Sequence, residues 1–600
     1  MFVRVLLSAL LCAALTLGPS GPLFSQEPPP EFELPDVISP ARRPQPASAS
    51  PASVSVITAA ELRRLGVRTA GEAIAFLPEV ASRAYGGAGG LITPSIRGSS
   101  AEQVLVLLDG VPLNGVFAGT VDLSTIPIDD IERIEVLRGP FSAIYGSGAM
   151  GGVISIVTRR RAPDAATVGG GSFGLLSLGI AGGGAARLTL RYDAATGERP
   201  NSDLRSGYFS LRLGDASPGR RWDLSLIGST GSRGSPGSTF WPSPLARQED
   251  SRLAAALTVE QERGTTTDRL RLTVHRENLA FRDPSWWTDD SHTGTAWAAE
   301  WQRTARISAS RVVALGADAQ LQHLRSTSVG ERSATVGALY VQDDRVLGPR
   351  LLLSAGLRAD LHSVYGAQIN PRVGLVYFLR PDLRLRLAAG RTFRGPTMAD
   401  LYYPFDGFAV GNPALRPEHA WSVDAGLEAS LGPRATARAT VFWSDVRDLI
   451  LWVPDAFFVF SPQNVGRASL RGASVEFEGA INPIWHLRAS STWLAATDTA
   501  TGLDLPNRAR HSAALALSAA LPRGASATAS AVLVGARFAD SANTVTLPAY
   551  VSVGLAAQVP LNAGSALRLS VQNLLDARYE PVQGYPAPGR TLMVEYVLRR

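Results

Sequence analysis

Two neighbouring segments decide the fold: VLVLLDGVPLN (104–114) and IERIEVLRGPFSAIYGSGAMGGVISIVTRR (131–160). The first opens with an apolar run that ends at Asp109-Gly110, a turn dipeptide, and this predicts a short buried strand. The second predicts one strand that stops at Gly139-Pro140 and another, β-branched strand at 153–158. Glycines are frequent where the backbone has to turn or approach another segment closely. The two segments together therefore predict a compact, mixed α/β unit.

The composition of the chain excludes several classes of enzyme. The chain has 600 residues and a formal net charge of +6, and all 58 basic residues are arginine because the sequence contains no lysine. Without lysine there is no Walker-type phosphate loop and no Schiff-base nucleophile. The only cysteine is Cys12, and the seven histidines are scattered singly, so no metal-binding or thiol motif is present. We therefore expect no catalytic residues, no metal, no cofactor and no enzymatic activity.

The first 53 residues predict a leader followed by a tether. Residues 1–25 combine Arg4 with a long apolar run, as in a secretory signal peptide. Residues 26–53 are rich in Pro, Ala and Ser, which predicts an extended tether. After the leader, no run approaches the ~18 apolar residues that a membrane helix requires. A secreted chain of this kind is either a soluble β-rich protein or a membrane barrel.

From about residue 166 onward, apolar and polar residues alternate with a period of two. In 353–361, leucine and alanine alternate with Ser, Gly, Arg and Asp, and in 383–387 three leucines alternate with two arginines. This period is typical of β-strands and fits a soluble sandwich as well as a membrane barrel. About 435 residues of such hairpins are too many for an open sandwich, and at about 20 residues per strand and connection they predict about 22 strands.

Blocks in both parts of the chain resemble the TonB-dependent receptors of the bacterial outer membrane. In the first part they are IRG (96–98), LLDGVPLN (107–114), IERIEVLRGP (131–140) and YGSGAMGGVISIVTR (145–159). In the second part they are FRGPTMADLY, GNPALRPEHAWSVDAGLE, VFWSDVRDLI, NVGRASLRGASVEFEG and VQNLLDARYEPVQGYPAPGR. The resemblance implies a transmembrane β-barrel of about 22 antiparallel strands (166–600), occluded by an N-terminal mixed α/β plug domain (54–161).

The resemblance also extends to the tether. The segment LPDVISPAR (34–42) is similar to the TonB box of the family, which would consist here of Asp36, Val37, Ile38, Ser39, Pro40, Ala41 and Arg42. In the family, this box adds as a strand to the periplasmic domain of TonB, so that main-chain hydrogen bonds supply the affinity. Pro40 lacks a donor N–H and would have to face the unpaired side of that strand. The alternative is a plain linker.

Two Gly-rich plug loops, 85–90 and 114–119, match loops that point outward in this family and touch the ligand. The resemblance therefore implies ligand contacts at Tyr85, Asn114 and Phe117, and the alternative is that these residues are plug surface. Charged residues in a water-filled lumen are expected to pair the plug with the barrel wall. The residues expected in these ion pairs are Arg97, Glu135, Arg138, Glu476 and Glu478.

The function implied by the resemblance is active import of a scarce, large ligand across a Gram-negative-type outer membrane. The plug run VPLNGVFAGTVDLSTIP (111–127) looks most similar to the cobalamin-transporter branch, and a ferric-siderophore receptor is the alternative. The expected partners are TonB with its inner-membrane energising complex, outer-membrane lipid and lipopolysaccharide, and a small-molecule ligand. We expect a monomer that binds no nucleic acid. A secreted β-rich adhesin without transport is the alternative from a different class.

Overall fold

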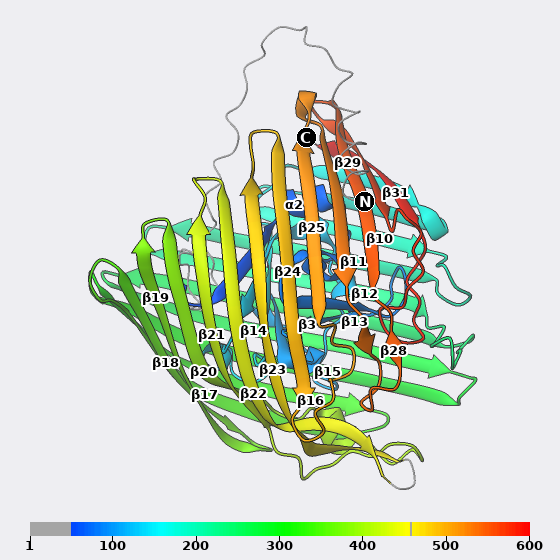
Figure 1. Ribbon diagram of the computed structural model, residues 1–600, viewed down its shortest axis with the longest axis horizontal. Coiled ribbons are helices and arrows are strands. Elements are labelled where there is room, and N and C mark those ends of the chain that lie inside the picture. Colours follow the sequence, from blue (N-terminus) through cyan, green and yellow to red (C-terminus); the bar gives the residue numbers. More distant parts are fainter. Residues whose placement is uncertain (1–49, 456–458, 600) are drawn as a thin grey trace. The chain divides into compact units, whose positions relative to one another are not determined.

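The structure is a computed structural model and describes residues 50–455 and 459–599. These residues form a closed barrel, a five-stranded sheet with short helices, and two small two-stranded ribbons (Figure 1). The expected signal peptide and TonB box lie outside the described residues, as does the tether up to residue 49. Within the described ranges, no helix is both long enough and apolar enough to cross a bilayer.

The N-terminal domain contains the two segments 104–114 and 131–160. Its elements are β1 (Ser53–Thr58), α2 (Ala59–Leu65), α3 (Ala70–Ala73), η3 (Ile74–Phe76), β2 (Val80–Ala84), β3 (Ile92–Ile96), η4 (Ala101–Gln103), β4 (Val104–Leu108), β5 (Val111–Pro112), η5 (Leu123–Thr125), η6 (Ile128–Asp130), β6 (Ile131–Arg138), α4 (Ser142–Tyr145) and β7 (Gly152–Thr158). The sheet has the order β1-β6-β7-β4-β5, and only β4 and β7 run parallel. The three predicted strands are β4, β6 and β7, at the centre of this mixed sheet.

The barrel contains 22 strands. They are β8 (Ala165–Gly171), β9 (Leu175–Gly182), β10 (Ala186–Ala195), β11 (Leu204–Ser217), β12 (Arg220–Gly234), β13 (Arg247–Arg263), β14 (Thr266–Asp283), β15 (Thr288–Ser308), β16 (Arg311–Ser326), β17 (Gly330–Val346), β18 (Leu351–His362), β19 (Gly366–Arg380), β20 (Leu383–Arg394), β21 (Glu418–Ser430), β22 (Ala435–Pro454), β23 (Phe460–Ala480), β24 (Trp485–Asp498), β25 (His511–Ala520), β26 (Ser526–Val534), β29 (Tyr550–Asn562), β30 (Ser565–Gln572) and β31 (Thr591–Arg599). Each strand pairs antiparallel with the next, and β31 pairs with β8 to close the ring. The predicted fold class is confirmed.

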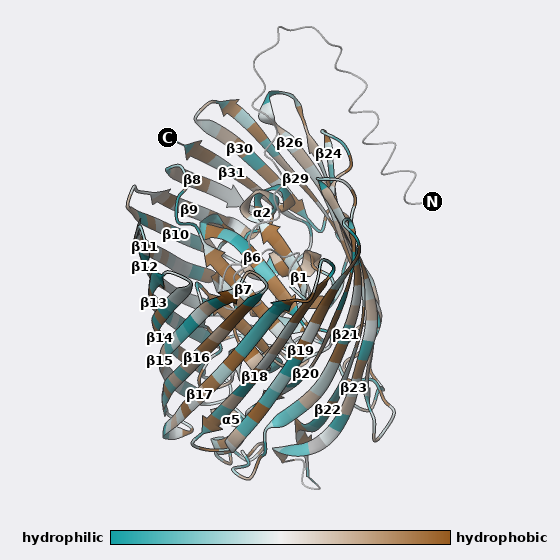
Figure 2. Cartoon of the chain, turned by 90° about the vertical axis from the view of Figure 1, so that its left-hand side faces the viewer, coloured by the Kyte–Doolittle hydropathy of each residue, from teal (hydrophilic) through white to brown (hydrophobic). Residues whose placement is uncertain are grey.

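Alternation along the strands separates an apolar outer face from a polar inner face. On β10, the side chains of Arg187 and Thr189 are buried, whereas Leu188 and Leu190 are 41% and 38% exposed. Figure 2 shows polar and apolar positions alternating in this way along the strands. Since a membrane barrel turns its apolar positions to lipid and its polar positions to the lumen, this is the pattern expected for a barrel in a bilayer.

The connections at the two ends of the barrel differ in length. At one end they are tight turns, such as 183–185 and 218–219. At the other end they include the long loops 235–246, 395–417 and 573–590, the second of which contains α5 (Met398–Tyr402). We call these the short-turn end and the long-loop end. In bacterial outer-membrane barrels the short turns face the periplasm and the long loops face outward.

The plug contacts the wall closely where its first helix ends. Thr58 and Glu61 form a capping box at the start of α2. The helix ends at Gly66, whose φ of 67° favours glycine. A Cβ at this position would lie only 2.6 Å from the Cβ of Ala556 on β29, so a glycine is also needed for the close approach of plug and wall.

Candidate functional site

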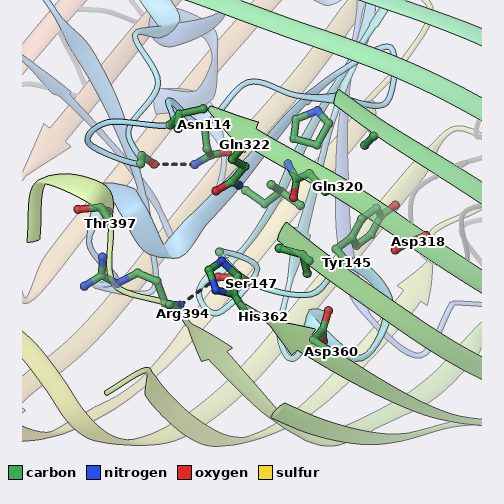
Figure 3. A pocket seen from close by; sticks show the side chains of 18 of the residues that line it. Asn114, Tyr145, Ser147, Asp318, Gln320, Gln322, Asp360, His362, Arg394 and Thr397 are labelled. Atoms are coloured by element: carbon green, nitrogen blue, oxygen red, sulfur yellow. Dashed lines mark hydrogen bonds between the residues drawn. The ribbon is translucent and has the colours of Figure 1, made fainter. Parts of the chain in front are cut away.

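A cavity of about 250 Å³ lies between the plug and the barrel wall (Figure 3). Residues of α5 and of the turn between β18 and β19 line it, so it lies toward the long-loop end. The labelled side chains in Figure 3 that line it are Asn114, Tyr145, Ser147, Asp318, Gln320, Gln322, Asp360, His362, Arg394 and Thr397. They come from the plug, from the strands β16, β18 and β20, and from the loop before α5.

Two of the three arginines that line this cavity are paired with carboxylates. Arg358 donates to Asp318 and, at 2.9 Å, to Asp360. Arg394 makes two hydrogen bonds of 3.0 Å to Glu418. Because Arg358 and Arg394 are paired in this way, neutral amide and hydroxyl groups make up a large part of the polar lining that remains for a ligand. In the described part of the chain, the side-chain amides of Gln320 and Gln322 donate to or accept from no other protein group.

The expected ligand contact Asn114 lines the cavity, and its amide also holds its own loop in place. Its Oδ1 accepts a hydrogen bond from the backbone N–H of Val106 at 3.0 Å. Its Nδ2 donates to the carbonyl oxygens of Val104 and Gly119, both at 2.9 Å. Asn114 therefore fixes the conformation of loop 114–119, and the ligand contact stays a prediction.

Phe117, on the same loop, contacts the barrel wall. Its ring stacks on that of His292, with the ring centroids 3.9 Å apart. Its carbonyl oxygen accepts a hydrogen bond from Ala399 N–H at the start of α5, at 3.0 Å. Loop 114–119 thereby contacts both the barrel wall and the long loop 395–417, so a ligand that moved one of these two loops would also displace the other.

Tyr85 lies on the other Gly-rich loop and contacts a different part of the barrel. Its ring meets edge-on that of Tyr585, a residue of the long loop 573–590, with the ring centroids 5.3 Å apart. Burial raises the pKa of Tyr85, so its hydroxyl stays protonated at neutral pH. The structure thus brings Asn114 and Phe117 together on one loop and places Tyr85 on a second loop.

Three arginines near Tyr85 were not identified from the sequence. Arg83 donates to Ser95 Oγ at 3.5 Å, Arg508 to Gly98 O at 2.9 Å, and Arg537 to Glu580 O and Pro581 O at 2.6 and 2.7 Å. In the described ranges, none of these three guanidinium groups has a carboxylate within 4 Å. They form a cationic cluster around Tyr85, which no motif in the sequence indicated.

The plug is held to the wall by buried ion pairs, and the centre of this network is Arg97. Arg97 has a left-handed backbone (φ 54°) and donates to Glu79 of the plug and to Asp424 of β21. All three side chains are buried. Burial alone would raise the pKa of Glu79, but Arg97 and Arg138 outweigh this effect and lower it.

The other four residues expected in ion pairs have the following partners. Arg138 lies 3.9 Å from Glu476 of β23, which also accepts from Ser55 of the plug at 2.9 Å. Glu478 pairs at 2.6 Å with Arg488 of β24, and this arginine also bonds Glu61 of the plug at 2.9 Å. Glu135 accepts from Arg133 on its own strand at 2.7 Å.

The sequence had not singled out Glu61, Glu79, Asp424 or Arg488 in this network. Inward-facing wall positions can be read from the alternation, but which of them meets which plug residue depends on how the plug is rotated in the barrel. In the residues described here, no group of three or more His, Cys, Asp or Glu side chains could hold a metal ion.

Two family models match the chain in succession. The TonB-dependent Receptor Plug Domain matches residues 46–153, and the TonB dependent receptor-like β-barrel matches residues 156–574. The chain therefore belongs to the TonB-dependent receptor family, and it forms a 22-stranded barrel of the outer membrane. Members of this family are transporters rather than enzymes, and membership implies interaction with TonB and binding of a small ligand.

Among curated proteins, the chain is similar to vitamin B12 transporters named BtuB. The one from Photobacterium profundum is 27% identical over 591 residues, 92% of this chain and 94% of that protein. The one from Vibrio cholerae is 27% identical over 624 residues, 97% of this chain and 98% of that protein.

Among solved structures, the chain resembles receptors for iron chelates. The siderophore receptor PirA from Acinetobacter baumannii has a TM-score of 0.79 and 18% identity, and the match covers 91% of this chain and 98% of PirA. The ferric-catecholate import receptor Fiu from E. coli has a TM-score of 0.79 and 15% identity, and the match covers 95% of this chain and all of Fiu. At these identities, the likeness shows the fold alone.

Proposed function

We propose that this chain imports cobalamin by TonB-dependent active transport. The observation that carries the proposal is the similarity to vitamin B12 transporters over more than nine-tenths of the chain, through plug and barrel alike. The cavity supports it, because the free amides of Gln320 and Gln322 suit the amide side chains that surround the corrin ring of cobalamin. About 250 Å³ accommodates only one edge of such a ligand, so its remainder would rest against the long loops.

Coupling would proceed through the TonB box. The segment 36–42 would add as a strand to TonB, and force transmitted through it would act on the plug. The buried pairs that join Arg97 to Asp424 and Arg488 to Glu61 would then have to break or exchange partners. Since each guanidinium group has five N–H donors, it can keep one carboxylate while it releases another.

A ferric siderophore is the second candidate ligand. The observation that favours it is the cationic cluster of Arg83, Arg508 and Arg537, because clustered positive charge suits a ligand with clustered negative charge. Tyrosines lie beside these arginines: Tyr85 next to Tyr585, and Tyr550 stacked on Tyr579 at 3.9 Å. The two candidates would therefore contact different residues: cobalamin the cavity at Gln320 and Gln322, and a ferric siderophore the arginine cluster.

Uptake by cells that express the chain separates the two candidates. Labelled cyanocobalamin should accumulate only when TonB is present, and excess ferric siderophore should not compete with it. The double variant Gln320→Leu/Gln322→Leu should raise the half-saturating cobalamin concentration, whereas Arg508→Gln should leave it unchanged. Competition by ferric siderophores together with sensitivity to Arg508→Gln would reverse the assignment. Uptake of neither ligand would refute both.

A further inference from the structure

A second cavity, of about 390 Å³, lies at the short-turn end, beside the segment that joins the plug to β8. Its charged lining consists of seven arginines and two carboxylates: Arg63, Arg159, Arg161, Arg187, Arg191, Arg568, Arg599, Asp129 and Glu132. They come from α2, η6, β6 and the end of the plug, and from the barrel strands β10, β30 and β31. So many guanidinium groups in one small volume repel one another unless an anion balances them.

The two carboxylates do not balance this charge. Asp129 is bound by Arg191 and lies 3.7 Å from Arg568. Glu132 is bound by Arg133 at 2.9 Å. Among the described residues, the remaining arginines of the cavity have no carboxylate within 4 Å: Arg63, Arg159, Arg161, Arg187 and Arg599.

Arg187 is the most deeply buried of these unpaired arginines, with 3% of its surface exposed. Its Nη1 donates to Ala162 O at 3.2 Å, while its Nε has no hydrogen-bond partner in the described structure. The neighbouring positive charges also act on Arg63 of the plug: burial together with Arg159, Arg568 and Arg599 lowers the pKa of Arg63 to about 10. A buried donor without an acceptor is costly, so the cavity calls for an oxyanion.

An apolar groove of about 390 Å³ on the outer surface of the barrel adjoins the arginine cavity. The exposed side chains of Ile180, Leu188 and Leu598 line it, around the small side chain of Ala166. The groove spans the ends of β31, β8, β9 and β10, including the seam where β8 pairs with β31, and Asp164 lies at its edge. Arg599 lines both the groove and the cavity. A single molecule could therefore place an anionic group among the arginines and an apolar chain along the seam.

We propose that the cavity and the groove together bind one phospholipid of the periplasmic leaflet. The short-turn end faces the periplasm, so this rim is level with the phospholipid headgroups of that leaflet. A phosphate diester carries one negative charge and accepts several hydrogen bonds from guanidinium groups, and Arg187 and Arg599 are placed to donate them. One acyl chain would lie against Ile180 and Leu598. The inference rests on the outer-membrane location of the barrel and is independent of the ligand that it imports.

The test measures lipid bound by the full-length protein in detergent, by native mass spectrometry. The probes are phosphatidylglycerol, diacylglycerol with the same acyl chains, and inorganic phosphate. The variants are Arg187→Gln and Arg599→Gln, with Arg282→Gln as the control, because Arg282 is exposed at the opposite end of the barrel. Heat-modifiable gel mobility confirms that each variant is a folded barrel. If Arg187→Gln does not fold, Arg599→Gln still tests the proposal, since the structure shows no hydrogen bond from the Arg599 side chain to the described residues.

The wild type and Arg282→Gln should retain one phosphatidylglycerol, and each cavity variant should bind it roughly tenfold more weakly, as expected for the loss of a charge-assisted hydrogen bond. Inorganic phosphate should not displace the lipid, because it lacks the acyl chain. Equal retention of diacylglycerol, equal retention of phosphatidylglycerol by the folded variants, or displacement by inorganic phosphate at equal concentration would each overturn the proposal. A failure of cobalamin uptake would not bear on the proposed phospholipid site.

Discussion

Asp424→Asn tests whether the buried ion pairs hold the plug in the barrel. The change keeps the size of the side chain and removes the charge that Arg97 of the plug meets on β21. Breaking a buried pair outright costs about 3–5 kcal/mol. Here Arg97 retains Glu79, so the loss is closer to that of one hydrogen bond to a charged group, about 2 kcal/mol. At 1.4 kcal/mol per factor of ten, this corresponds to roughly a 30-fold larger population of locally released plug.

Hydrogen exchange with mass spectrometry of the purified protein measures this population directly. Peptides from β2 and β3 should exchange roughly 30-fold faster in Asp424→Asn, while peptides from strands far from β21, such as β13, should be unchanged. The matched control is Asp289→Asn, because the pair of Asp289 with Arg282 is more than 65% exposed on both side chains and should contribute little. If the plug exchanged within twofold of the wild-type rate, or if the barrel accelerated equally, the pair of Arg97 with Asp424 would not be what holds the plug in place.

Three further predictions follow from the plug and its tether. Because the folded pKa of Glu79 is below its ordinary value of 4.5, the stability it contributes is complete above pH 4.5 and is lost as the pH falls through the folded pKa. Acidification from pH 6 to pH 3 should therefore loosen the plug more in the wild type than in Glu79→Gln, as followed by hydrogen exchange, and equal loosening would contradict this. Deletion of residues 35–42 should abolish energised uptake of the ligand and leave its binding to the cell surface intact. If uptake continued after the deletion, the segment would be a plain linker. Asn114→Ala removes three hydrogen bonds that hold loop 114–119, each contributing about 1 kcal/mol. This variant should bind the ligand at least roughly tenfold more weakly, while the melting temperature of the barrel stays unchanged. An unchanged affinity in a titration would exclude a role for this loop.

Local and periodic features could be predicted from the sequence. The strands β4, β6 and β7 follow from short apolar runs between turn residues, and the start of α2 follows from the capping side chain of Thr58. The barrel follows from alternation sustained over more than 400 residues, which leaves few other ways to satisfy the backbone in a membrane. In each case the determinant lies within one segment or repeats along the chain.

The contacts between plug and wall could not be predicted in the same way. Glu476 and Glu478 occupy equivalent inward positions of β23, yet Glu476 binds Ser55 of the plug, whereas Glu478 pairs with Arg488, which in turn binds Glu61 of the plug. Asp424, which binds Arg97, looks in the sequence like any other polar position of an alternating strand. Which wall residue meets which plug residue depends on packing between segments more than 300 positions apart, and no local pattern encodes it.

The seam between β8 and β31 has a consequence for assembly. β8, the first strand of the ring, follows the plug directly in the chain, and it pairs with β31, the strand of the ring that is synthesised last. The ring can close only when β31 has been synthesised, so the plug domain, which is synthesised first, has no complete barrel around it until then. Any factor that inserts this protein into the membrane must therefore accommodate both an open barrel and a plug domain that has already been synthesised.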